Sequence, residues 1–272
     1  MPIMPAKRLL TCLCVFCLLA CSLLACDVIP SISVNGTPVT SSSGGTTLNE
    51  WMPVKPGVEL RYEQWKAASG DEDTVIITRI DPAKVHISVG YQPNKPLSMK
   101  NWMKQTNATV IINGGYFDAQ DQATALTISN GQAYGGSYQG CCGMFAVDSQ
   151  GNASIQSLAD QPYDPSQQLQ QATQSRPLLL VNGKRTQFQE DSATTRRTLI
   201  AEDTQGRLLF IVSPSQAFAL NELADVLEKT DLSLKTVLNL DGGTSTGIYV
   251  NGGGQHVALD PITTLPIVII VK

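Results

Sequence analysis

Histidine is nearly absent from the sequence, with only His86 and His256 among 272 residues. A zinc site built from several histidines is therefore excluded, and a Ser-His-Asp triad has few candidates. Charged residues make up only 15% of the chain, and the formal net charge is −4. A nucleic-acid-binding protein needs a basic face for the phosphates, so this balance argues against nucleic acid as a partner.

Long-range periodicity is absent as well. The sequence has neither a Gly-X-Y period nor a heptad repeat, which excludes collagen-like and coiled-coil architectures. The hydrophobic fraction of 42% is too high for a wholly disordered chain. A chain of 272 residues is long enough for one large domain or two small ones with a real core.

The N-terminus has the features of an export signal. Lys7 and Arg8 precede an apolar run over residues 9–25, as in a secretory signal peptide. The sequence LLAC at 23–26 resembles a bacterial lipobox, whose cysteine is lipidated and becomes the first residue of the mature protein. The alternatives are a second match that ends at residue 21 and an uncleaved membrane helix.

We therefore expect a lipoprotein signal peptide at 1–25 and a lipid, such as palmitate, on Cys26. Residues 26–53 are rich in Ser, Thr and Gly, which predicts a flexible tether. The tether would hold a folded domain of residues 54–272 outside the cytoplasm, anchored to the cell membrane.

Few cysteines remain once the signal is removed. Four of the seven lie within residues 1–25, which leaves Cys26 and the adjacent pair Cys141 and Cys142. This number does not make a disulfide framework. The adjacent pair either forms a vicinal disulfide or stays as two small buried thiols.

Strand-like segments outnumber helical ones. Residues rich in Val and Ile, or alternating in polarity, predict strands at 58–65, 74–80, 84–91, 108–113, 235–240 and 266–271, and hairpins at 126–132, 144–155 and 199–212. Two helices are expected, one over 98–106 and one with an apolar stripe made by Leu220, Leu223, Ala224 and Leu227. The Gln-rich segment 156–176 is expected to be a long surface loop. The predicted class is α+β, a single domain with a large mixed, mainly antiparallel sheet and a few packed helices.

Two segments share one design, INGGYFD at 112–118 and LNLDGGTS at 238–245. In each, an apolar strand runs into an Asn, a pair of glycines and an Asp. Glycines allow a sharp turn close to a ligand, and successive amides can bind an anion. The Asp supplies a carboxylate at the end of a strand. Ordinary glycine turns with Asn and Asp as turn formers are the alternative interpretation.

These segments, together with LLLVNGK at 178–184 and RTLIA at 197–201, resemble the bacterial phosphodiester glycosidase family over residues 70–272. The resemblance implies hydrolysis of a sugar-1-phosphodiester, which releases the sugar and leaves a phosphomonoester. It implies three catalytic residues, Asp118, Asp241 and Arg197. The expected substrate-binding residues are Asn113, Gly114, Gly115, Tyr116, Asn239, Gly242, Gly243 and Ser245.

The roles within this set follow from the chemistry. Arg197 and the glycine amides are candidates for holding the phosphodiester. Asp118 and Asp241 are candidates for general acid, general base and the group that faces the anomeric carbon, and the sequence does not decide between them. Two departures from the family pattern bear on substrate preference. Thr244 stands where the family usually has a third Gly, and Thr264 where it often has a basic residue.

No cofactor is required by the sequence. Asp118, Asp241 and Asn239 offer hard oxygen ligands suited to Ca²⁺ or Mg²⁺, but no compact spacing demands a metal. The expected partner is a glycosyl phosphodiester, of the N-acetylglucosamine-1-phosphodiester type, or an envelope or exopolysaccharide glycan. Two alternatives stay open, a non-catalytic glycan-binding or exopolysaccharide-assembly lipoprotein on the same fold, and a metal-dependent phosphodiesterase.

Overall fold

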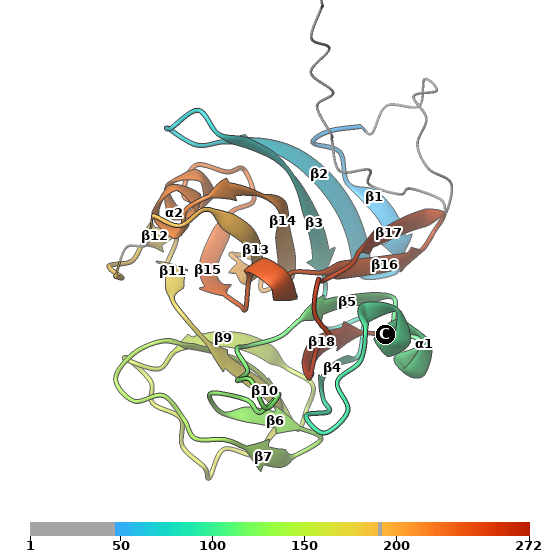
Figure 1. Ribbon diagram of the computed structural model, residues 1–272, viewed down its shortest axis with the longest axis vertical. Coiled ribbons are helices and arrows are strands. Elements are labelled where there is room, and N and C mark those ends of the chain that lie inside the picture. Colours follow the sequence, from blue (N-terminus) through green and yellow to red (C-terminus); the bar gives the residue numbers. More distant parts are fainter. Residues whose placement is uncertain (1–46, 190–191) are drawn as a thin grey trace, which may run out of the picture. The chain divides into compact units, whose positions relative to one another are not determined.

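The computed structural model describes residues 47–189 and 192–272 (Figure 1). The predicted signal peptide, Cys26 and most of the predicted tether lie outside the described residues. Strand β1 (Met52–Lys55) begins two residues before the predicted start of the domain. Within the described part of the chain, no helix is both long and apolar enough to cross a membrane.

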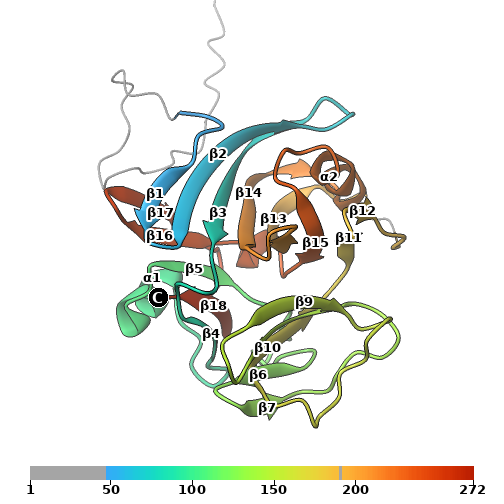
Figure 2. The same ribbon diagram turned by 180° about the vertical axis from the view of Figure 1, so that it is seen from behind.

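The strands form three sheets (Figures 1 and 2). The first contains β1, β2 (Val58–Lys66), β3 (Glu72–Ile80), β11 (Leu178–Val181), β12 (Lys184–Arg185), β13 (Thr195–Asp203), β14 (Leu208–Phe218) and β15 (Leu234–Asn239), in the order β1-β2-β3-β14-β13-β15-β11-β12. The second contains β6 (Thr127–Ser129), β7 (Gln132–Tyr134), β8 (Gly143–Asp148), β9 (Ala153–Ser157) and β10 (Leu169–Ser175), in the order β7-β6-β10-β8-β9. The third contains β4 (Ile87–Tyr91), β5 (Val110–Asn113), β16 (Ile248–Gly252), β17 (Gln255–Leu259) and β18 (Ile267–Val271), in the order β17-β16-β5-β18-β4.

The prediction of a largely antiparallel β structure is confirmed, but the fold is richer in sheet than predicted. There are three sheets instead of one large sheet, and every ladder in them is antiparallel. Parallel neighbours need long crossover connections, usually helices, and the described residues contain only two α-helices. Most of the strands are instead joined to their neighbours as hairpins.

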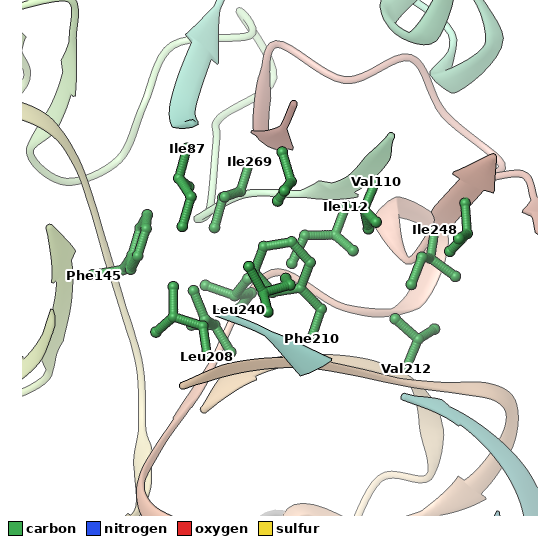
Figure 3. Close-up of a cluster of buried hydrophobic side chains, with 14 of the residues drawn as sticks. Ile87, Val110, Ile112, Phe145, Leu208, Phe210, Val212, Leu240, Ile248 and Ile269 are labelled. Carbon is green, nitrogen blue, oxygen red and sulfur yellow. The ribbon is translucent and has the colours of Figure 1, made fainter. Parts of the chain in front are cut away.

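The main core lies where the three sheets face one another (Figure 3). Strand β14 shows how the sequence builds it, since Leu208, Phe210 and Val212 point into this core. The alternate residues Leu209 and Ile211 point to the opposite face of the sheet, into a second apolar cluster. Because successive side chains of a strand alternate between faces, a strand that is buried on both sides reads as a continuous apolar run.

The two helices cover outer faces of the sheets. Helix α1 (Met99–Thr106) begins at Ser98, whose Oγ accepts a hydrogen bond from the Asn101 N–H at 3.3 Å, and ends at Asn107 in the left-handed conformation (φ 53°). Its Trp102 is buried and donates its ring N–H to Leu265 O at 2.8 Å.

The apolar stripe predicted at residues 220–227 is confirmed. Helix α2 (Leu220–Leu227) buries all four of its predicted apolar residues. They pack in the second apolar cluster, on the face of the eight-stranded sheet that points away from the main core. The helix therefore seals the side of this sheet to which Leu209 and Ile211 point.

The prediction of a surface loop over 156–176 is wrong for its last third. Residues 169–175 form β10, the central strand of the second sheet, and Thr173, Gln174 and Ser175 are buried. The strand is hard to recognise because its buried side chains are polar. Three of them form hydrogen bonds inside the fold: Gln171 Oε1 accepts the Val89 N–H at 2.9 Å, Thr173 Oγ1 accepts the Gly115 N–H at 3.3 Å, and Gln174 Oε1 accepts the Tyr138 N–H at 2.8 Å.

Candidate active site

The two similar sequence segments meet in space, although 128 residues separate Asn113 from Asp241. Strand β5 ends at Asn113 and strand β15 ends at Asn239. The Asp241 N–H donates to Gly114 O at 3.1 Å, and the Asn113 Nδ2 donates to Asp241 O at 2.7 Å. Each segment therefore fixes the other, and the Asp241 carboxylate is set at their junction.

Asn113 joins these segments from inside the protein. Its side chain is 1% exposed, and its Oδ1 accepts hydrogen bonds from Thr198 Oγ1 at 2.8 Å and from the Gly247 N–H at 3.2 Å. Together with the bond to Asp241 O, these contacts connect β5 to β13 and to the turn after β15. The structure thus assigns Asn113 a structural contact, and its predicted contact with substrate stays a prediction.

Asp241 is a largely buried carboxylate. Its Oδ1 accepts the Gly242 N–H at 2.9 Å. Burial raises the pKa of Asp241, and the hydrogen bonds with Ser245 and the Gly242 N–H, which favour the charged form, offset only part of this effect. A carboxylate with a raised pKa is a stronger base than an ordinary Asp, which suits a proton-transfer role.

Tyr116 and Asn239 extend the site to one side of Asp241. The Asn239 Nδ2 donates to Tyr116 Oη at 2.9 Å and to Arg176 O at 2.8 Å, and Tyr116 Oη donates to Arg176 O at 3.1 Å. Burial raises the pKa of Tyr116, and the charge of Asp241 raises it further. The Asn239 hydrogen bond and the charges of Arg197 and Arg176 act in the opposite direction. Tyr116 is therefore within electrostatic reach of one carboxylate and two guanidinium groups.

One acceptor in this network lacks a hydrogen-bond partner in the described part of the chain. The Oδ1 of Asn239 is buried and has no hydrogen-bond partner among the residues that the structure describes. A buried acceptor without a partner carries a free-energy cost, which a ligand hydroxyl or a water could relieve. Asn239 is only 1% exposed, however, so its predicted contact with the substrate stays a prediction.

Arg197 is held firmly behind the site. It is only 6% exposed, and its guanidinium donates to Phe218 O at 3.2 Å and to Ala193 O at 2.6 Å. Its positive charge nevertheless reaches Tyr116. The geometry therefore favours an electrostatic effect at a distance over the bidentate contact with a phosphate that the sequence suggested.

The remaining predicted binding residues lie in the two turns. Gly114 and Gly115 follow β5, and Gly242, Gly243 and Ser245 lie in and beside the short 3₁₀ turn η1 (Gly243–Ser245). Gly243 has φ +59°, a conformation that favours glycine. Gly115 is required for a different reason, because a Cβ at this position would lie 2.5 Å from Gln174 O and 2.7 Å from Thr173 Oγ1.

The Gly115→Ala variant should therefore be destabilised. The obstacle is the backbone of the neighbouring strand β10, so the chain must shift, and we expect a loss of about 1–3 kcal/mol in the free energy of unfolding. Denaturant titration measures this loss. The matched control is Gly136→Ala, where a Cβ would meet no atom within 4 Å and stability should stay within about 0.5 kcal/mol. Equal stability of the two variants would contradict the close approach at Gly115.

The structure does not bring Asp118 into this network. Asp118 is exposed, and its Oδ1 accepts the N–H groups of Gln120 and Gln122, each at 2.9 Å. The carboxylate thus stabilises its own turn.

Within residues 47–189 and 192–272, no group of three or more His, Cys, Asp or Glu side chains is placed to hold a metal ion.

Two residues of the site were missed by the sequence analysis. Arg176 directly follows β10, inside the segment that was expected to be a loop, and Thr198 is a buried partner of Asn113. The sequence RPLLLV at 176–181 carried a usable signal for Arg176, since a proline directly before an apolar run marks the start of a strand. The motif RTLIA contains Thr198, but nothing in the sequence indicates which side of the strand it faces.

A comparison with protein-family models matches residues 106–271 to the phosphodiester glycosidase model. This chain belongs to the phosphodiester glycosidase family. The match includes both glycine motifs, Arg176 and Arg197. Membership supports a glycosyl phosphodiester hydrolase at the level of the family. Comparison with curated protein sequences gives no significant match.

Solved structures show the same fold. The catalytic domain of zebrafish N-acetylglucosamine-1-phosphodiester alpha-N-acetylglucosaminidase, auto-inhibited by its pro-peptide, matches with a TM-score of 0.64 and 21% identity, over 84% of this chain and 89% of that one. A hypothetical protein from Synechocystis matches with a TM-score of 0.57 and 15% identity, over 81% of this chain and 64% of that one. At these identities the likeness concerns the fold alone.

Proposed function

We propose that this member of the family hydrolyses the bond between sugar and phosphate in glycosyl-1-phosphodiesters. The observation that carries the proposal is the position of Asp241, a largely buried carboxylate with a raised pKa that acts on Tyr116 together with two guanidinium groups. A carboxylate and guanidinium groups that act on the same tyrosine suit a substrate that develops positive charge at the anomeric carbon and negative charge on the departing phosphate.

One carboxylate is enough for this reaction because the leaving group is good. A phosphomonoester has a second pKa of about 6, so it leaves as a stable anion and needs little help from a general acid. In this mechanism Asp241 takes the proton of the attacking water. Arg176 and Arg197 stabilise the phosphate, and Asn239 positions the Tyr116 hydroxyl. Asp118, which is committed to its own turn, is not required.

The proposed substrates and location follow from the family and the N-terminus. N-acetylglucosamine-1-phosphodiesters are the first candidates, because the zebrafish structure with this fold carries that substrate in its name. The same linkage in envelope or exopolysaccharide polymers would be available to a lipoprotein anchored through Cys26.

Labelling cells with a palmitate analogue tests the proposed lipid anchor. The label should be absent from a Cys26→Ala variant.

The experiment that tests the activity uses UDP-GlcNAc and a GlcNAc-phosphomannoside, with and without a chelator, and measures free GlcNAc. Release of GlcNAc that is insensitive to the chelator supports the proposal. Activity that requires metal would favour a metal-dependent phosphodiesterase. Glycan binding without hydrolysis would favour a non-catalytic binding protein.

The dependence of activity on pH should follow Asp241. If water is activated by the ionised carboxylate, kcat/KM falls as the pH drops through the pKa of Asp241. Burial raises this pKa above the ordinary Asp value of about 3.9, so the acidic limb should lie above pH 3.9. A profile of kcat/KM against pH measures it. A limb at or below the ordinary Asp value would contradict the role of Asp241 as base.

A further inference from the structure

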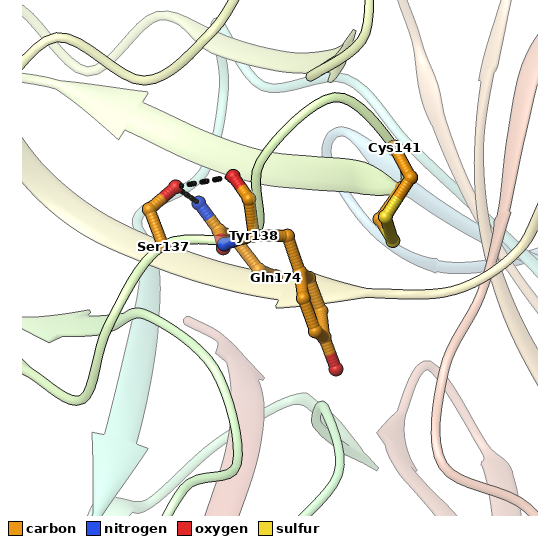
Figure 4. The surroundings of a disulfide bond; sticks show 5 residues. Ser137, Tyr138, Cys141 and Gln174 are labelled. Carbon is orange, nitrogen blue, oxygen red and sulfur yellow. Dashed lines mark hydrogen bonds between the residues drawn. A yellow bond between two sulfur atoms is a disulfide. The ribbon is translucent and has the colours of Figure 1, made fainter.

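The loop before β8 carries a disulfide between two neighbouring residues, Cys141 and Cys142 (Figure 4). Both cysteines line a cleft of about 910 Å³, and Tyr116 and Arg176 line the same cleft. Since Tyr116 and Arg176 belong to the network around Asp241, the disulfide lies in the wall of a cavity that reaches the candidate active site. Cys141 is exposed, so a small thiol in solution can reach the pair.

This loop is fixed at both ends. At its start, the Tyr138 N–H donates to Gln174 Oε1 at 2.8 Å, which ties the loop to β10. At its end, Gly143 is buried and is the first residue of β8, where it pairs with β9 on one side and with β10 on the other. A change in the cysteine pair therefore acts on residues 139–142 and on the groups that contact them.

Cys142 has a backbone conformation that a residue with a Cβ disfavours. Its φ is +79°, in the left-handed region, where side chains are rarely found. The disulfide closes a small ring that contains the N–Cα bond of Cys142, which is the bond about which φ turns. The closed ring therefore restricts φ at Cys142, and an open ring leaves the residue free to return to negative φ.

The carbonyl of Cys142 connects this conformation to a second part of the cleft wall. It accepts the N–H of Leu158, a buried residue, at 3.0 Å. The neighbours of Leu158, which are Ser157 and Ala159, line the cleft, and so does Asp160. A change of φ at Cys142 turns its carbonyl away from Leu158, so the two stretches of the wall lose the hydrogen bond that joins them.

We propose that the Cys141–Cys142 disulfide is a redox-sensitive clamp on the wall of this cleft, opened by a small dithiol. A thiolate of the dithiol attacks one sulfur of the pair, the S–S bond breaks, and the other cysteine leaves as a thiolate. The second thiolate of the dithiol then displaces the first cysteine. Each released cysteine takes one proton. The dithiol thus gives up two electrons and two protons and becomes a cyclic disulfide, while the pair becomes two thiols.

Opening the clamp weakens the binding of substrate. A reduced molecule presents the original wall only in the fraction of time that Cys142 stays left-handed, and the apparent affinity falls by that fraction. Asp241 lies outside the loop, so the chemical step itself is unchanged. This effect on substrate rests on the proposed hydrolysis of glycosyl-1-phosphodiesters.

The first readout does not depend on activity. The full-length chain is treated with dithiothreitol, and alkylation followed by mass spectrometry shows whether Cys141 and Cys142 have become thiols. Hydrogen exchange is then measured at the Leu158 amide. We expect it to be at least about tenfold faster after reduction, because the amide loses its acceptor. A pair that stays oxidised in excess dithiol, or exchange that is unchanged after reduction, would overturn the clamp.

The second readout is the hydrolysis of a GlcNAc-1-phosphodiester. Reduction of the parent protein should raise KM by about fivefold or more and leave kcat within about twofold. The variant Cys141→Ser/Cys142→Ser should have the raised KM without any treatment and should not respond to the dithiol. The matched variant Cys141→Ser/Cys142→Gly also lacks the disulfide. Glycine adopts a φ of +79° readily, so KM of this variant should lie closer to that of the parent protein.

The outcomes separate this inference from the proposed function. An unchanged KM after reduction, or equal KM values for the two variants, would overturn the clamp and leave the hydrolase proposal intact. If the ester is not hydrolysed at all, the hydrolase proposal fails, and exchange at Leu158 decides the clamp. Faster exchange after reduction, and faster exchange in the Ser/Ser variant than in the Ser/Gly variant, would support it. Equal exchange in all of these forms would overturn it.

Discussion

Replacing Asp241 by asparagine should lower kcat by a factor of about 10² to 10⁴, the range found when a positioned acid or base is removed. The introduced amide has nearly the same shape as the carboxylate and could still accept the Gly242 N–H, but it could not take a proton from water. Steady-state hydrolysis of a GlcNAc-1-phosphodiester measures the effect. Binding of the substrate should be largely retained, so the loss should appear in kcat and not in KM.

The control is the equivalent change at the other predicted catalytic aspartate. Asp118→Asn keeps an Oδ1 that can accept the Gln120 and Gln122 N–H groups, so the turn should persist. We expect activity within about threefold of the parent protein, since a change that stays away from substrate alters little. A large loss in Asp118→Asn with activity retained in Asp241→Asn would overturn the assignment.

The same Asp241→Asn variant should be more stable than the parent protein at neutral pH. Because burial raises the pKa of Asp241, the folded state binds more protons than the unfolded state between the ordinary Asp pKa of about 3.9 and the raised value. The stability of the parent protein therefore falls as the pH rises through this window, and asparagine removes that loss. The difference in melting temperature should disappear below about pH 3.9. A variant that is both inactive and less stable at pH 7 would indicate a structural role instead.

Removing the side chain of Asn113 should cost about 3 kcal/mol or more of the free energy of unfolding. In Asn113→Ala, the Thr198 hydroxyl, the Gly247 N–H and the Asp241 carbonyl would each lose a buried partner. A buried polar group without a partner costs about 1–3 kcal/mol. Urea titration measures the loss, and activity should fall with it because the two glycine turns are no longer held together.

Two further variants sharpen this test. Asn113→Asp keeps an acceptor for Thr198 and Gly247 but places an oxygen against Asp241 O, so it should also be strongly destabilised. The exposed Asn94→Ala variant should stay within about 0.5 kcal/mol of the parent protein. An Asn113→Ala variant that is as stable as Asn94→Ala would show that these hydrogen bonds do not hold the site together.

The sequence predicted those parts of the fold whose residues show a clear apolar pattern. Helix α2 was recognised because its apolar residues follow the helical period, and strand β5 because it is a short continuous apolar run. Strand β10 was missed because Thr173, Gln174 and Ser175 are buried although they are polar. Their burial depends on partners such as Tyr138, which approach only in the folded chain.

The candidate site was predicted in its residue types but not in its distances. The two glycine motifs pointed to Asp241 and Asn239, and the structure places both in one network with Tyr116. The motifs also predicted Asp118 as a catalytic residue, on equal terms with Asp241. Local spacing cannot distinguish a carboxylate that closes its own turn from one that faces a ligand. That distinction depends on tertiary contacts.

The measurement that tests the central claim most directly is the position of isotope incorporation. Hydrolysis of a GlcNAc-1-phosphodiester is carried out in water enriched in ¹⁸O, and both products are analysed by mass spectrometry. If the bond between the anomeric carbon and oxygen breaks, the label enters the released GlcNAc and the phosphomonoester stays unlabelled. Label in the phosphomonoester would mean attack at phosphorus, and it would contradict the assignment of this site to glycosidic cleavage.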